Sequence, residues 1–359
     1  MSFEIRPLTE SDDAALVQLF ASASKDEKLW MWQDRSPSFF DLWKLACPDP
    51  QHHYLGVFHN DELIGCSGRN SCLLPEPFER KIGYVDTDLF VLEDYRTTRW
   101  AAKLFKARID RYVAEVSMQG LLWGVEHEPG GLSIGSSYTK RSAGQNFYFP
   151  FESVLSHSPV FEKTLDVAKG GSCESTKLKD LSTRQLESFL ENYRTFRKDE
   201  TIFPKLDSGF LQRLQIVEPE AQILTNKDQT AGALMCSLRS LRRWKSTGPK
   251  GLVLERLRRA RGWENLSGQE IKFQMLGMTW GGSVALEDLY RQARTFANEH
   301  GFDFLVTRDF LPAVTDPRAI QFKRRIFFGY GDLSTDKGAS ILEWTKDPKV
   351  CFRAEVFLI

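Results

Sequence analysis

Apolar runs, amphipathic stretches and turn residues alternate along the chain in an order that predicts a mixed α/β fold. Residues 3–20 begin as an alternating strand pattern and continue as an amphipathic helix. Residues 53–67 predict a β-hairpin with its turn at Asn60-Asp61. The apolar run 83–91 predicts a further strand, and a helical pattern follows it as far as Val116. A strand that leads through a short turn into a helix presents free backbone N–H groups, which favour an anion.

The second half of the chain repeats this order. A helical pattern within 174–200 precedes a hairpin whose turn is Lys227-Asp228, then a strand over 271–280 and a helix that opens at Gly281. The distance from the helix-opening residue to the next glycine is nearly the same in both halves. Downstream we predict a strand in 302–309, a helix over Ala319–Phe328 and two closing strands, 341–344 and 351–359. The repeated order predicts a duplicated unit, with a boundary in 157–175.

The loop at the first of these helices resembles a known family. Val91 and Tyr95 match the strand end V-x-x-x-Tyr that precedes the pyrophosphate loop of the GCN5-related N-acetyltransferases. Arg96 and Ala101 match that loop, Gln/Arg-x-x-Gly-x-Gly/Ala, whereas Arg99 stands where the family has glycine. The resemblance implies an α/β (α+β) fold of two tandem domains, each a mixed, mostly antiparallel, splayed sheet flanked by helices. It places an N-terminal, catalytic domain at 1–160 and a degenerate or substrate-shaping C-terminal domain at 172–359.

Composition narrows the alternatives. A chain of 359 residues suits about two domains, and its formal net charge of zero gives no overall attraction to nucleic acid, so we expect no nucleic-acid partner. No apolar run is long enough to span a membrane, and the N-terminus lacks the pattern of a signal segment. The six cysteines and six histidines show no metal-ligand spacing. We therefore expect a cytoplasmic protein with reduced thiols, no metal and no membrane contact.

The resemblance implies a cofactor and the residues that hold it. The cofactor would be acetyl-CoA or another acyl-CoA, bound by backbone amides at the helix start and by side-chain donors. The expected cofactor-binding residues are Phe90, Val91, Arg96, Thr97, Thr98, Arg99, Trp100 and Ala101. The second loop, which includes Gly281, has no basic residue but is sterically closer to the family pattern.

The chemistry of amine acylation requires a base for the ammonium and an acid for the departing thiolate. By resemblance, Tyr138 is the candidate acid, and its counterpart in the second copy would be Phe322. Strand alternation would put Asp86, Asp88 and Phe90 on one face, where Asp88 could hold a cationic acceptor or accept its proton. Glu126 and His127 follow the next strand, where the two central strands would separate, and are further candidates.

Two functions remain open at this stage. One is transfer of an acyl group from an acyl-CoA or a carrier-protein thioester to a small-molecule amine; the other is a repurposed, non-catalytic binding or regulatory module. The basic segment 239–261 is either a docking surface for an acyl carrier protein or another anion, or a solvated connection between strands. The aromatic-rich segment 29–45 either lines an apolar acceptor site or belongs to the core.

Overall fold

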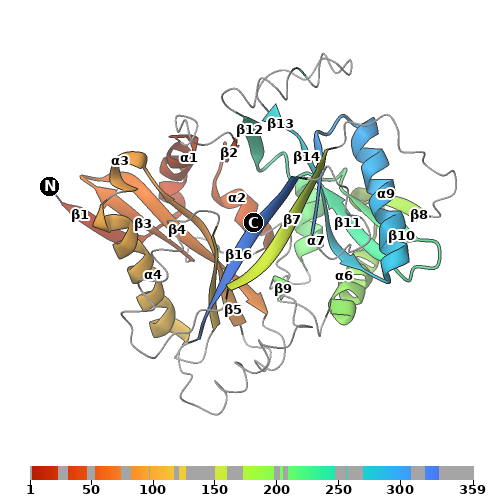
Figure 1. Cartoon of the computed structure of the whole chain (residues 1–359), viewed down its shortest axis with the longest axis horizontal. Helices are drawn as coiled ribbons and strands as arrows, with labels where there is room; N and C mark the ends of the chain where they lie inside the picture. The colour runs from red at the N-terminus through yellow and green to blue at the C-terminus, as the bar shows by residue number, and fades with distance from the viewer. Residues whose placement is uncertain are drawn as a thin grey trace, which may run out of the picture.

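The computed structural model describes residues 2–22, 31–46, 53–73, 82–96, 98–116, 121–126, 150–159, 173–197, 203–204, 209–246, 256, 270–308 and 320–330. The helices and strands follow each other in one chain order, with labels as in Figure 1. The first half holds β1 (Phe3–Pro7), α1 (Asp13–Ala21), β2 (Met31–Asp34), α2 (Phe40–Ala46), β3 (Tyr54–His59), β4 (Glu62–Leu73), β5 (Ile82–Val91), α3 (Glu93–Arg96), α4 (Arg99–Val116), β6 (Leu121–Glu126) and β7 (Pro150–Pro159). The second half holds β8 (Cys173–Lys177), α6 (Thr183–Arg197), β9 (Phe203–Pro204), α7 (Phe210–Val217), β10 (Gln222–Asn226), β11 (Gly232–Cys236), β12 (Arg243–Ser246), β13 (Glu270–Ile271), β14 (Phe273–Trp280), α9 (Ser283–Glu299), β15 (Phe304–Arg308) and β16 (Ile320–Tyr330).

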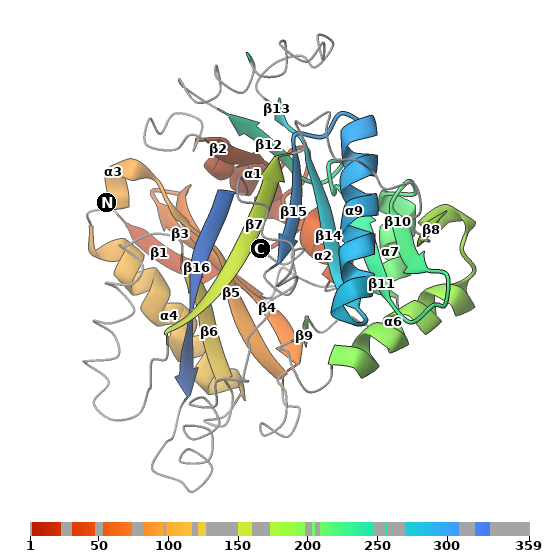
Figure 2. The same ribbon diagram turned by 45° about the vertical axis from the view of Figure 1, so that its right-hand side comes forward.

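The main sheet is built from two halves that exchange their last strands. Its described strands run in the order β1-β3-β4-β5-β6-β16-β7-β15-β14-β11-β10-β8, with β9 beside β4. Thus β16, from the end of the described chain, pairs with β6, while β7, from the first half, pairs with β15. The two exchanged strands also pair with each other, and Figures 1 and 2 show them crossing the middle of the molecule side by side.

The strand order is equivalent when it is followed inward from either end of the sheet: β1-β3-β4-β5-β6-β16 from one end and β8-β10-β11-β14-β15-β7 from the other. Two equivalent halves are what the predicted repeat requires. The pairings of the sheet are antiparallel except for one parallel pair in each described half, β5 with β6 and β14 with β15. Each parallel pair is short: β5 pairs with β6 only from Tyr84 to Asp86, although β5 continues to Val91. The central strands of each half therefore separate beyond this point, as the predicted splayed sheet requires.

Both predicted hairpin turns are confirmed. Asn60 and Asp61 have φ of 49° and 67° between β3 and β4, as a two-residue hairpin turn needs. Residues Lys227 and Asp228 lie in the turn between β10 and β11. These local signals predict the register of the hairpins because turn chemistry and strand alternation act over a few residues.

A β-bulge interrupts the central strand of each half, which corrects the expected alternation in the first of them. In β5 the register to β4 shifts around Asp88, whose φ is 52°, and in β14 the register to β11 shifts around Met278, whose φ is 47°. Unbroken alternation through Asp88 is therefore wrong. Met278 therefore stands at the position equivalent to Asp88, and α3 is an extra turn with no counterpart between β14 and α9.

The predicted helix Ala319–Phe328 is wrong. Residues Ile320–Tyr330 form β16, whose backbone groups are bonded on both sides, to β6 and to β7. Its run of branched and aromatic residues suits a strand, and long-range pairing outweighs the local helical pattern. Phe322 thus lies on a strand opposite Leu155. The segment that contains Tyr138, and the two predicted closing strands, lie outside the described residues.

One hydrophobic cluster joins the two halves. Leu16, Phe39 and Trp43 of the first half belong to the same buried cluster as Phe210 and Met275 of the second. Helix α2 lies against α7, and the Arg213 guanidinium donates a 2.6 Å hydrogen bond to the carbonyl oxygen of Leu45. The core interpretation therefore holds for the buried aromatic residues of segment 29–45, Phe39, Phe40 and Trp43.

The turn between β14 and α9 yields a matched test of backbone geometry. Gly281 has φ of 120°, and a Cβ there would lie 2.3 Å from the Cβ of Ala231, whereas a Cβ on Gly282 would meet nothing within 4 Å. Gly281→Ala should lower the free energy of unfolding by about 1–3 kcal/mol or more, while Gly282→Ala, at the N-cap of α9, should lower it by about 0.5 kcal/mol. Urea unfolding of both variants checks this, and equal stabilities would contradict it.

Candidate functional site

The candidate functional site lies where β5 and β6 separate. Beyond Asp86 no described strand pairs with β5 on its β6 side, so in the described part of the chain this edge of β5 has no strand beside it. The bulge at Asp88 lies in this stretch, and α3 and α4 follow directly after it. An unpaired strand edge followed by a helix start offers backbone N–H and C=O groups to an extended ligand with an anionic end.

Asp88 is the centre of a buried hydrogen-bond network. Its Oδ1 is 3.0 Å from the Nη2 of Arg35, in an ion pair, and its Oδ2 accepts a 2.8 Å hydrogen bond from the Tyr54 hydroxyl. The Cys66 thiol donates to the backbone carbonyl of Asp88 at 3.3 Å. The Arg35 side chain is 1% exposed and that of Asp88 9% exposed. Both oxygens of a scarcely exposed carboxylate are therefore held in fixed directions.

Burial controls the protonation of the groups around Asp88. It raises the pKa of the Tyr54 hydroxyl well above its usual value, and the negative charge of Asp88 adds to this effect. Burial likewise raises the pKa of the Cys66 thiol. Tyr54 therefore remains a neutral donor, and Cys66 remains a thiol rather than a nucleophilic thiolate.

A second buried arginine comes from the other half of the chain. Arg242 is 5% exposed, and its Nη2 lies 3.7 Å from the sulfur of Met275. Burial, followed by the positive charge of Arg35, lowers the pKa of Arg242 to about 9, although Asp88 acts in the opposite direction. The two halves thus bring two guanidinium groups within electrostatic reach of one carboxylate.

The α3–α4 turn arranges the predicted cofactor-binding residues. Arg96 ends α3, and its Nε donates a 2.8 Å hydrogen bond to the carbonyl of Val91, which ties the turn to the end of β5. The Thr98 hydroxyl donates to Tyr95 and accepts from the Trp100 amide at 3.3 Å, as a residue that caps a helix does. Arg99 begins α4 with an exposed side chain.

The predicted cofactor-binding residues have different structural roles in this turn. Arg99 has an exposed side chain at the start of α4, the end of a helix that favours an anion. Arg96 holds the turn in place, and Thr98 already satisfies one helix-start amide. Thr97 lies outside the described residues, while Ala101 follows Trp100 in the first turn of α4. The arrangement fits an anionic cofactor group at the start of α4.

The remaining predicted site residues are only partly placed. Glu126 is the last residue of β6 and so lies on the strand that separates from β5. His127 and Tyr138 lie outside the described residues. In the described part of the chain, no group of three or more His, Cys, Asp or Glu side chains could hold a metal ion.

The basic segment 239–261 is partly structural. Arg239 forms an ion pair with Glu270, and Lys245 lies 2.6 Å from Asp34. Residues Arg243–Ser246 form β12, which pairs with β2 of the first half in a separate three-stranded sheet. The described start of this segment therefore binds the two halves together instead of forming a free basic surface.

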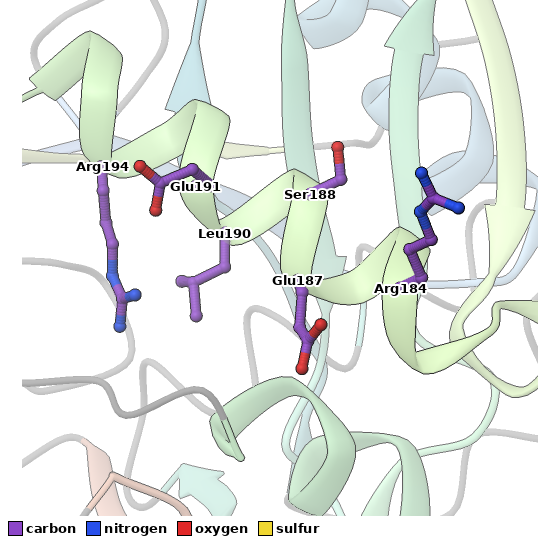
Figure 3. Close-up of a pocket in the computed structure, with 6 residues that line it drawn as sticks. All are labelled: Arg184, Glu187, Ser188, Leu190, Glu191 and Arg194. Carbon is purple, nitrogen blue, oxygen red and sulfur yellow. The ribbon is translucent and has the colours of Figure 1, made fainter.

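A depression of about 360 Å³ lies on α6, away from the separated strands. Figure 3 shows its residues projecting from a single helix: Arg184, Glu187, Ser188, Leu190, Glu191 and Arg194. Charges of both signs alternate along an exposed helix face here, which is the usual pattern of a solvated helix. We assign no chemistry to it.

Sequence reasoning found Asp88 but missed Arg35, Tyr54 and Arg242. Asp88 was conspicuous because a carboxylate on a central strand needs a partner. Its ion-pair partner, Arg35, lies 53 positions away and sits in an ordinary polar stretch. Arg242 is one basic residue in a basic run. Only the pairing of β2 with β12 brings them together.

The comparisons with known proteins point to one fold. No protein-family model matches the chain, and no curated protein matches its sequence. Among solved structures, N-myristoyltransferase of Saccharomyces cerevisiae with bound myristoyl-CoA matches with a TM-score of 0.61 and 11% identity, over 91% of this chain and 82% of that one. A GCN5-related N-acetyltransferase from Anabaena variabilis matches at 0.51 and 10%, over 92% and 74%, and one from Kribbella flavida at 0.50 and 11%, over 90% and 70%. No described helix is long and apolar enough to cross a membrane.

The Asp88 network generates a stability prediction. Tyr54→Phe removes a hydroxyl from the carboxylate in a buried setting and should lower the free energy of unfolding by about 1–3 kcal/mol. Tyr95→Phe is the matched control because its hydroxyl, hydrogen-bonded to His59 at 2.9 Å, is only half-buried, so a smaller loss is expected. Urea unfolding measures both, and a neutral Tyr54→Phe would contradict the network.

Proposed function

Because the chain has the tandem fold of the GCN5-related N-acetyltransferase superfamily, we propose that it is an acyltransferase, which moves an acyl group from a coenzyme A thioester to an amine. The observation that carries the proposal is the separation of β5 from β6 beside an exposed helix start. A solved neighbour of the same tandem fold, N-myristoyltransferase, is described with myristoyl-CoA bound, which supports a cofactor of the acyl-CoA class.

Residues of the first half would hold the cofactor. Bound there, the coenzyme A thioester supplies the activated acyl group. The amides at the start of α4 and the Arg99 guanidinium bind its phosphates, and Arg96 keeps their turn attached to Val91. The open edge of β5, at Phe90 and Val91, orients the chain that leads to the thioester. The acetyl group and longer acyl groups both remain within this class.

The catalytic work of the chain is mainly positioning. Asp88 and Glu126 lie on the two separating strands, where one carboxylate would hold the ammonium of an acceptor close to the thioester and one would accept its proton as a general base. His127 is a further candidate base, next to Glu126 in sequence. Tyr138 is the proposed acid, which protonates the departing thiolate. The acceptor is a small-molecule amine, and a carrier-protein thioester is an alternative acyl donor.

The second candidate function is a non-catalytic binding or regulatory module with the same fold. Arg99 in place of glycine favours it, because a side chain replaces the close backbone approach that glycine allows. The two functions differ in one measurement. If the chain is an acyltransferase, acyl-CoA should raise its melting temperature, and free thiol should be released when amines are added. If it is a module that binds no cofactor, neither effect is expected.

Changes of charge at the starts of α4 and α9 test which of these two helices binds the cofactor. Arg99→Glu should weaken acyl-CoA binding about tenfold to a hundredfold, since a charged hydrogen bond contributes about 1.5–3 kcal/mol. The matched variant Val284→Glu places a carboxylate in the first turn of α9 at an exposed position. Isothermal titration calorimetry with acetyl-CoA and myristoyl-CoA should show that Val284→Glu binds them with the same affinity as the unchanged chain. The reverse result would place the cofactor at Gly281–Ser283.

The proposed acid can be tested by removing one hydroxyl group. Tyr138→Phe should retain acyl-CoA affinity while turnover falls on the order of 10²-fold, as loss of a general acid predicts. Tyr95→Phe, at a hydroxyl hydrogen-bonded to His59, is the control and should keep full turnover. Thiol release at saturating thioester is the readout. Full turnover in Tyr138→Phe would remove this residue from the mechanism and favour Glu126 or His127.

A further inference from the structure

The fold alone leaves the length of the acyl group open. One solved neighbour of this fold, N-myristoyltransferase, is described with myristoyl-CoA bound, whereas two others are described as N-acetyltransferases. A long acyl chain gains affinity only if an apolar space beside the thioester takes it out of water. In this chain, the packing around the last part of β5 decides whether there is such a space.

Strand pairing closes one end of the candidate site. From residue 87 to residue 91, a stretch of about 16 Å, no described strand pairs with β5 on its β6 side. At Asp86 the two strands join, because Asp86 pairs with Gly124 of β6. A cofactor that enters from the start of α4 and lies along β5 therefore meets paired backbone just beyond Asp88. The acyl group has no path farther along the strand.

Aromatic rings fill the face of the sheet on which the Asp88 carboxylate lies. The Tyr54 hydroxyl, which donates to that carboxylate, marks this face. Phe90 of β5 lies 5.3 Å from Phe20 of α1, measured between ring centroids. Phe20 lies 5.1 Å from Phe39, and Phe39 lies 5.3 Å from Tyr54. Rings at these separations are in direct contact, so the four form a continuous aromatic row from β5 into the core.

The inner end of the aromatic row is closely packed. Phe39 and Tyr54 are both 0% exposed. A Cβ on Gly68 of β4 would lie 2.1 Å from the Tyr54 ring, so even one added methyl group would collide there. Close-packed interiors accept additional methylenes only at a cost in stability. Phe20 and Phe90, at the outer end, are half-buried and are therefore the rings nearest to an acyl group beside Asp88.

The opposite face of the sheet is filled by a second core. Helix α4 packs against β3 and β4 on that face. The aliphatic side chains between them form one buried cluster, Leu55, Val57, Ile64 and Leu104. Among the described residues, both faces of the sheet are thus occupied by the chain's own side chains at the level of the candidate site.

We propose that the acyl group transferred is short, of the acetyl to butyryl class, and that the rings of Phe20 and Phe90 limit its length. The inference rests on the proposed function, because it takes the thioester to lie beside Asp88. It makes the aromatic row a determinant of donor specificity: a longer acyl chain would stay in contact with water and gain nothing from burial.

The first test uses the unchanged chain and a series of donors. Isothermal titration calorimetry with acetyl-CoA, butyryl-CoA and octanoyl-CoA should give affinities for the acetyl and octanoyl donors within about threefold of each other, because the added methylenes remain in water. Each buried methylene would instead raise the affinity about fourfold. A rise of that size through octanoyl-CoA would overturn this inference alone, whereas absence of binding by all three donors would overturn the proposed function and the inference with it.

The second test opens the outer end of the aromatic row. Phe20→Ala removes the ring beside Phe90, so the affinity for octanoyl-CoA relative to acetyl-CoA should rise about tenfold or more. This ratio does not depend on the folded fraction, because both donors bind the same folded molecules. Phe20→Leu, which keeps more of the packing, should shift the ratio in the same direction and is used if Phe20→Ala does not fold.

Phe296→Ala is the matched control. Phe296 is also a half-buried phenylalanine on a helix, but it packs against a separate hydrophobic cluster in the second half of the chain. Its substitution should leave the ratio of the two affinities unchanged. An unchanged ratio in the Phe20 variant, or an equal rise in the control, would overturn the role of the aromatic row.

Discussion

The pairing of β7 with β16 is the constraint on which the rest of the structure depends. Each strand comes from one half, lies beside the last parallel strand of the other, and is bonded on both sides. β16 covers the edge of β6 and β7 covers the edge of β15, so neither strand is an exposed sheet edge. The pairing also fixes the two halves relative to each other, so residues from both can meet in one buried cluster.

That fixed geometry explains why the candidate site is built from distant segments. Arg35 and Arg242 directly adjoin the paired residues Asp34 and Arg243 of the small sheet formed by β2, β12 and β13. Asp88, at the bulge of β5, forms an ion pair with Arg35 and acts electrostatically on Arg242. A bulge re-aims a side chain without ending the strand, and Asp tolerates a positive φ better than most residues do. Met278 at the equivalent bulge has no charge, so the two copies are similar in backbone but differ in chemistry.

The two repeats differ where a helix follows their central strand. The first ends its central strand with an added helical turn, α3, and an arginine at the start of α4, whereas the second passes through Gly281 directly into α9. An exposed cation adds positive charge beside a helix start, whereas a glycine lets other groups approach the backbone there more closely. The shared core of Phe39, Phe210 and Met275 makes either half incomplete without the other.

The sequence by itself determined the local elements: the two hairpins with their turns, the strand before Val91, the helices that follow the central strands, and the repeat itself. These depend on alternation, turn residues and helix periodicity within a few positions, which are legible in one dimension. It also indicated Asp88. Tertiary structure decided the rest. Residues 320–330 form a strand because two neighbouring strands bond to them. The bulge shifts Asp88 out of simple alternation. Arg35 and Arg242 can be recognised as part of the candidate site only from the long-range pairing of β2 with β12.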